Sequence, residues 1–242
     1  RDRSPSRGLG DVYKRQQLGI GHVIWRFDPL ILTDKININL LLKKIEYIGN
    51  KLFGYTEKLV FSFADIASYK KVKLNLEKNG INYIEWNDAS MNEFAKQLSE
   101  LNKKWNYQLA TCGERIDIQQ YGIEHNHCVD DNLMIRFAHE DKVLMDFLKV
   151  DIIKMQPVLF DIPEIPEDAI KINDSTYAIK RKNNSDKGQR AFCGCMISKD
   201  IGEYSTCPHL CEYCYANTNK LSAKSNYKQH LNNSFSETIT GK

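Results

Sequence analysis

The sequence contains no apolar stretch of about 20 residues, the length that a helix needs to cross a bilayer. Its most apolar runs, 22–25 and 144–153, are soon interrupted by charge. It also lacks a phosphate-binding glycine loop, a serine nucleophile elbow and a dinucleotide fingerprint. These absences predict a soluble protein without a membrane partner, and they remove the nucleotide-binding and hydrolase classes that such motifs mark.

The chain has little net charge beyond its first residues. Its 242 residues carry 34 basic and 31 acidic side chains, a net charge of +3. Five basic and two acidic residues lie within 1–16, so the whole surplus belongs to that segment and the rest is balanced. A nucleic-acid partner, which requires a basic footprint, is therefore not supported.

The first residues differ in character from the rest. The segment 1–16 has no initiating Met, no apolar period and no hydrophobic stretch of the kind found in signal peptides. We interpret it as a non-native leader that resembles translated adapter sequence. Residues 18–25 then begin directly on a buried-strand pattern, so we expect an N-terminally truncated fragment. Without a secretory signal we expect a cytoplasmic protein.

The composition of the whole chain is close to the globular average, with 42% hydrophobic and 27% charged residues. Short β-rich runs alternate with helical periods, which predicts an α/β fold with a parallel sheet and crossover helices. We expect strands at 22–27, 58–63 and 107–112, helices at 38–52 and 68–79, and one or two helices within 130–154. A further helix begins at Ser90, which with Glu93 fits a capping box.

Composition predicts five segments along the chain. After the leader, residues 17–154 form the βα body. Prolines and a polar stretch at 173–190 indicate a linker or mobile loop at 155–191. A cysteine module then occupies 192–217, and a polar C-terminal tail occupies 218–242.

Five of the seven cysteines lie between positions 193 and 214. The motif Cys207-Pro-His-Leu-Cys211-Glu-Tyr-Cys214 has the spacing Cys-x3-Cys-x2-Cys and follows Cys193-Gly-Cys195. Three thiolates so spaced can each hold one iron of a cuboidal iron-sulfur cluster and leave the fourth iron open. The alternative is a structural zinc site made by Cys193, Cys195 and two of the later three. For Cys193 and Cys195, a fourth ligand, a second site and simple packing stay open.

The motif resembles that of the radical S-adenosylmethionine superfamily, in which Tyr213 also has a counterpart. The resemblance implies that Cys207, Cys211 and Cys214 hold a 4Fe-4S cluster whose open iron binds S-adenosylmethionine. It further implies an electron donor protein and a substrate whose identity stays open. Two features depart from the superfamily: the motif follows the last strand instead of the first, and no Gly-Gly-Glu tripeptide is present.

The whole chain resembles an uncharacterised bacterial family, a domain of unknown function with a C-terminal cysteine cluster. The pieces that carry the resemblance are Val23-Ile-Trp-Arg-Phe-Asp-Pro29, Ser62-Phe-Ala-Asp65, Thr111-Cys-Gly-Glu114, Cys193-Gly-Cys195, and the stretch from Asp200-Ile-Gly-Glu-Tyr-Ser-Thr-Cys207 to Cys214-Tyr-Ala-Asn217. The resemblance implies an incomplete, TIM-barrel-like parallel βα body whose opening strands are missing, followed by an iron-sulfur module.

Chemistry in βα folds gathers at the carboxyl ends of the strands. That rule selects Arg26, Asp28, Asp65, Cys112 and Glu114 as candidate catalytic residues that would order a polar substrate. Each acid has a structural alternative: Asp28 as a turn opener, Asp65 as a helix cap and Glu114 as a surface residue. If Arg26 is buried, it would need an ion pair with Asp28 or Asp65, or an anionic ligand.

The stretch His125-Asn-His127-Cys128 contains metal-ligand residue types, but adjacent residues rarely converge on one ion without further ligands. We therefore expect no metal role there and expect Cys128 to be dispensable. Two functions follow for the whole chain. One is a radical S-adenosylmethionine-like iron-sulfur enzyme, and the other is a non-catalytic binding or scaffold protein with a structural zinc or iron-sulfur site.

Overall fold

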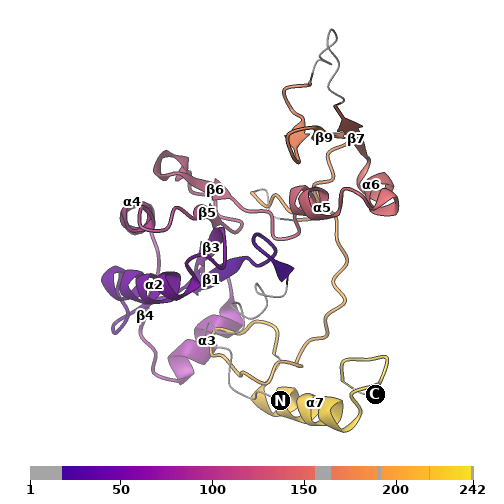
Figure 1. Cartoon of the computed structure of the whole chain (residues 1–242). Helices are drawn as coiled ribbons and strands as arrows, with labels where there is room; N and C mark the ends of the chain where they lie inside the picture. The colour runs from indigo at the N-terminus through magenta and orange to yellow at the C-terminus, as the bar shows by residue number, and fades with distance from the viewer. Residues whose placement is uncertain (1–17, 156–164, 190–191, 218, 241–242) are drawn as a thin grey trace. The chain divides into compact units, whose positions relative to one another are not determined.

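The computed structural model describes residues 18–155, 165–189, 192–217 and 219–240, which are drawn in colour in Figure 1. They form two compact units, residues 1–124 with 199–242 and residues 125–198, called unit 1 and unit 2 here. The expected leader 1–16 lies outside the described residues, as do 156–164 and 190–191 of the expected linker. In the described part of the chain, no helix combines the length and apolarity that a membrane span requires.

A four-stranded sheet organises unit 1. Its strands follow the order β1 (Trp25–Leu30), β3 (Lys58–Phe63), β5 (Gln108–Thr111) and β6 (Ile123–His125). Both β1 with β3 and β3 with β5 pair in parallel. A small antiparallel pair, β2 (Leu32–Thr33) with β4 (Tyr83–Ile84), lies outside this sheet. The expected α/β fold with a parallel sheet is confirmed.

Helices connect the parallel strands, as their crossovers require. α2 (Ile38–Leu52) links β1 to β3, and α3 (Lys70–Lys78) and α4 (Asp88–Asn102) lie between β3 and β5 in the sequence (Figure 1). A 3₁₀ turn (Gln119–Tyr121) precedes β6. Gly54 and Gly80, which follow α2 and α3, have φ values of +80° and +64° that glycine adopts without steric cost. The expected bounds of α2 are confirmed.

The core of unit 1 fills the space between one face of the sheet and the helices α2 and α4. It is rich in aromatic side chains, which meet edge to face or stack, as Trp105 does on Tyr107 with ring centroids 5.5 Å apart. The polar atoms of these rings are satisfied, since Trp86 Nε1 donates to Leu30 O and Tyr107 Oη donates to Gly49 O at 3.0 Å. Burial raises the pKa of Tyr107 to about 12.

The capping box of α4 lies three residues earlier than the sequence suggested. Asn87 is the N-cap: its side-chain oxygen accepts from Ser90 N at 2.9 Å, and Ser90 Oγ accepts from Asn87 N at 3.0 Å. Ser90 therefore acts at the third helical position, and Glu93 instead accepts a hydrogen bond from Gln97 on the helix surface. Asn is as good an N-cap as Ser, so the pattern fitted two registers.

Unit 2 is built from two helices and an antiparallel sheet. α5 (Asp131–Ala138) and α6 (Lys142–Leu148) precede a sheet of order β7-β9-β8, formed by β7 (Val150–Lys154), β8 (Ile170–Lys171) and β9 (Thr176–Lys180). Its core consists of Ile135, Met145, Leu148, Val150, Ala178 and Met196.

This arrangement corrects three expectations about the second half of the chain. Residues 150–154 form a strand and not the end of a helix, because they pair with β9. The described part of the expected linker contains β8 and β9, where Thr176 and Ala178 alternate inward. The expected tail contains α7 (Lys220–Asn232), which Asn219 caps by accepting from Ser222 N at 2.7 Å.

We predict that Gly49→Ala destabilises unit 1 by about 1–2 kcal/mol, although Ala is the better helix former. A Cβ at this position would lie 2.7 Å from two ring carbons of Trp105, which is 7% exposed and stacked on Tyr107. Urea unfolding followed by tryptophan fluorescence measures this, because Trp25, Trp86 and Trp105 all lie in the unit 1 core. Exposed Lys44→Ala should stay within about 0.5 kcal/mol. Equal or higher stability of Gly49→Ala would contradict the packing argument.

Candidate functional site

Three polar side chains meet on one face of the parallel sheet. Arg26 and Asp28 are two residues apart on β1 and therefore point to the same side. Arg26 Nη2 lies 2.5 Å from Asp28 Oδ2, and the Ser62 hydroxyl of β3 donates to the other oxygen, Asp28 Oδ1. Asp28, the central member, is thus held by both a cation and a hydroxyl.

Arg26 has in Asp28 the acidic partner that the sequence required. Both residues lie within β1 and not at its carboxyl end, where the sequence placed them. The Arg26 side chain is 39% exposed, so Arg26 is not the buried cation that was considered. Ser62 was not among the expected site residues, although it is the first residue of Ser62-Phe-Ala-Asp65, one of the pieces that carry the family resemblance. Its position, one residue before the end of a buried strand, was the available signal.

Glu114 reaches the end of the central strand. Its Oε1 accepts from Phe63 N at 2.8 Å, so a carboxylate that follows β5 is fixed at the last residue of β3. Cys112, half-buried, precedes it and donates from its backbone N to Phe61 O at 3.0 Å. Gly113 between them has a φ of +67°, which lets the chain turn back toward β3.

Asp65 serves the turn that follows β3. Its Oδ1 accepts from Ser68 N at 3.2 Å, a local hydrogen bond typical of a turn-forming aspartate, and the residue is exposed. The helix α3 begins later, with Tyr69 at its N-cap. Asp65 thus has a structural contact within its own turn.

The cysteine motif of unit 1 lies on a loop that closes on itself. Ser205 N donates to Ala216 O at 3.1 Å, and Asn217 Nδ2 donates to Cys207 O at 3.0 Å. The backbone N of Asn217 also lies 3.4 Å from Cys214 Sγ, its acceptor. Asn217, which is 6% exposed, therefore connects the first and last cysteines of the motif.

This motif loop (residues 205–217) is fastened to α3. Lys71 donates its ammonium group to Asn217 O, and Asn79 Nδ2 donates to Glu212 Oε2 at 3.0 Å. Tyr213 packs against an apolar cluster at the start and along the inner side of α3, made of Ala64, Ile66, Val72 and Leu76. The aromatic residue that precedes the last cysteine is thus a packing anchor.

The motif cysteines are accessible. Cys207 and Cys211 are exposed, Cys214 is half-buried, and none of the described cysteines forms a disulfide. Thiolates of this kind suit iron and zinc. In the described loop the three sulfurs do not form a group with all atoms within 4.8 Å of one another. Zinc bonded tetrahedrally at about 2.3 Å would draw its sulfurs to about 3.8 Å, so a closed zinc site is not preformed here.

Cys193 and Cys195 belong to unit 2 and so have different neighbours. Cys195 is buried, and its Sγ accepts from Cys128 N at 3.1 Å and from Val129 N at 3.5 Å. Burial raises the pKa of the Cys195 thiol, while the two backbone N–H groups oppose that rise. The roles expected for Cys193 and Cys195 as ligands stay predictions.

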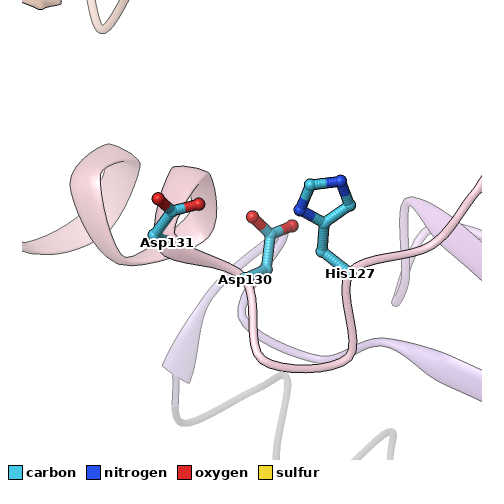
Figure 2. Close-up of side chains that lie close together, drawn as sticks. All are labelled: His127, Asp130 and Asp131. Carbon is cyan, nitrogen blue, oxygen red and sulfur yellow. The ribbon is translucent and has the colours of Figure 1, made fainter. Parts of the chain in front are cut away.

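Among the described residues, one group has ligand atoms that all lie within 4.8 Å of one another: His127, Asp130 and Asp131 (Figure 2). Two of its members already have structural partners. Asp130 caps α5 by accepting from Asn132 N at 2.9 Å, and buried Asp131 pairs with Lys180 Nζ at 2.7 Å. The sequence missed this group because it considered His127 with His125 and Cys128 only.

We predict that Asn217→Ala loosens the motif loop, since its hydrogen bond to Cys207 O is worth about 1 kcal/mol. In the metal-free protein, alkylation of half-buried Cys214 by iodoacetamide should become about fivefold faster. Mass spectrometry of the modified peptide measures that rate. Asn232→Ala, at the exposed end of α7, is the control and should leave it unchanged. Equal rates in the two variants would show that the side chain of Asn217 does not hold the loop.

Comparison with known proteins gives one relationship. The model of a family described as a domain of unknown function, DUF1848, matches residues 14–216. No curated protein and no solved structure matches significantly. The matched region covers both the strand-end residues and the cysteine motif, and far more than half of the chain. The chain therefore belongs to the DUF1848 family.

Proposed function

We propose that the protein is an iron-sulfur protein that acts as a radical S-adenosylmethionine-like enzyme on an unidentified polar substrate. Cys207, Cys211 and Cys214 are its metal ligands, and a 4Fe-4S cluster is the group they hold. The observation that carries the proposal is the motif loop itself, a spaced set of three accessible thiols fastened to α3 in the unit that contains the parallel sheet.

The residues present fit such a cluster. Three of its four irons need one thiolate each, and the motif supplies three cysteines, of which Cys207 and Cys211 are exposed. The Asn217 N–H that points to Cys214 Sγ is the kind of hydrogen bond that tunes a thiolate-bound cluster. When bound, the cluster supplies one electron for reductive cleavage of S-adenosylmethionine.

The polar residues of β1 and β3, together with Glu114, would bind the substrate. Arg26 and Asp28 offer a cation and an anion side by side, and Ser62 offers a hydroxyl, which together suit a substrate with several polar groups. Glu114 has one oxygen fixed by Phe63 N, so its second oxygen is held in a defined direction. In the same proposal the parallel sheet is part of a longer βα barrel, the protein is cytoplasmic, and a donor protein supplies the electron.

We predict that Ser substitution at Cys207, Cys211 or Cys214 abolishes iron and sulfide content after anaerobic reconstitution of the full chain. Each substitution leaves a second iron without a ligand, so the cluster is lost. Iron and sulfide analysis, together with the absorbance near about 400 nm, measures the result. Cys112→Ser and Cys128→Ser are the cysteine controls and should keep the iron.

Full iron and sulfide in Cys211→Ser would overturn the ligand assignment and make Cys193 and Cys195 the leading candidates. Colourless protein with zinc and no sulfide would favour the alternative, a non-catalytic binding or scaffold protein with a structural metal site.

Catalysis has a separate test. Reconstituted protein incubated with dithionite and S-adenosylmethionine should release 5′-deoxyadenosine. Asp28→Asn should keep the iron and lower turnover of a substrate, because Asp28 is the residue that joins Arg26 to Ser62. A stable cluster that never yields 5′-deoxyadenosine would refute the enzyme and leave the iron-sulfur protein.

A further inference from the structure

Two segments of unit 2 that are far apart in sequence lie side by side with their metal-ligand residues in register. The ring of His125 stacks on Phe192 with centroids 6.1 Å apart, the ring of His127 contacts Gly194, and Cys128 N donates to Cys195 Sγ at 3.1 Å. In each pair the two residues are 67 positions apart in the sequence. The stretch 125–129 therefore runs alongside 192–196.

Backbone hydrogen bonds hold the second segment in this place. Met196 N donates to Val129 O at 3.0 Å, and Asp186 N donates to Cys195 O at 2.9 Å. Met196 is also a member of the apolar core of unit 2, where it is 5% exposed. The position of Cys195 beside Cys128 thus depends on main-chain pairing and core packing, and not on the thiols themselves.

The imidazole of His127 fits closely against this segment. A Cβ at Gly194 would lie 2.5 Å from His127 Cδ2 and Nε2, so the ring occupies space that any residue other than glycine would fill. His127 Nδ1 is buried and has no hydrogen-bond partner. Figure 2 shows this nitrogen turned toward Asp130, so Nε2, which lies beside Gly194, is the His127 nitrogen that faces the Cys-Gly-Cys segment.

We propose that unit 2 contains a second metal site, in which Cys128, Cys193, Cys195 and His127 bind a thiophilic divalent ion of the zinc class. Three thiolates and one imidazole form a standard tetrahedral zinc set. Cys195 Sγ already lies 3.1 Å from Cys128 N, and metal binding would draw together ligand atoms that do not yet all lie within 4.8 Å of one another. The N–H groups of Cys128 and Val129 would support the Cys195 thiolate as outer-shell donors.

Asp130 and Asp131, whose carboxylates lie close to His127, could form a different metal site with it. Their existing hydrogen bonds and ion pair disfavour that site. Asp130 already caps α5, and Asp131, 96% buried, is neutralised by Lys180. A cation bound by them would have to displace that cap and lie next to the Lys180 ammonium group. A hard, oxygen-preferring ion would use them nonetheless, so the choice of ion separates the two sites.

The test uses a full chain in which Cys207, Cys211 and Cys214 are all replaced by Ser, so that it does not depend on the iron-sulfur proposal. After chelation and addition of Zn²⁺, we expect one zinc per chain by elemental analysis. Adding Cys128→Ser or Cys195→Ser should weaken binding by more than the roughly 10- to 100-fold that loss of an outer-shell partner causes. Adding Cys112→Ser, the matched control in unit 1, should leave binding unchanged.

Cobalt substitution gives a readout that survives a folding failure of any one variant. Co²⁺ in the background chain should show thiolate-to-metal charge transfer, and the band should be insensitive to Asp130→Asn. The site would be overturned if the background chain did not bind zinc. It would also be overturned if Cys128→Ser and Cys195→Ser left the zinc affinity of the background chain unchanged. If the chain bound Mn²⁺ and Co²⁺ gave no thiolate charge-transfer band, the ion would be assigned to Asp130 and Asp131 instead. If the chain without Cys207, Cys211 and Cys214 loses iron and still binds zinc, the zinc site is supported independently of the iron-sulfur proposal.

Discussion

The burial of β3 on both faces is the constraint on which unit 1 depends. Leu59, Val60 and Phe61 are fully buried, and the strand hydrogen-bonds in parallel to β1 on one side and β5 on the other. The strand cannot shift by one residue without moving Phe61 and Phe63 out of the aromatic core and Ser62 into it. Ser62 and the N–H of Phe63 are consequently fixed at its end, and they position Asp28 and Glu114. The polar face depends on an apolar strand.

The same strand determines where the cysteines lie. The chain leaves β3 through Ala64 and Ile66, which form an apolar cluster with α3, and Tyr213 of the motif loop packs into that cluster. Lys71 of α3 and Asn79, its C-cap, add polar contacts to the loop. One continuous stretch, from β3 to the end of α3, thus supports both groups of candidate residues in unit 1. A motif late in the sequence is thereby fastened to the helix that follows an early strand.

Local patterns in the sequence identified the elements of unit 1 well. The apolar run Lys58–Phe63 and the three- and four-residue period of Ile38–Leu52 each report burial directly, and both elements have the expected bounds. The strand β9 was missed because Asn, Lys and Asp surround it, and its stability comes from pairing with β7. The contact between Cys128 and Cys195 was missed for the same reason. Long-range pairing leaves no local period in a sequence.

Unit 1 is discontinuous in the chain, since residues 125–198 separate its two parts. Bringing the motif loop to α3 therefore closes a long loop, at an entropic cost that grows with the logarithm of loop length. Folding of unit 2 within that loop removes most of its freedom beforehand and lowers the cost. On the ribosome, α3 is complete long before the motif cysteines emerge, so the motif loop joins a surface that already exists. Closure of the motif loop is thereby a late event that reports on the folding of the whole chain.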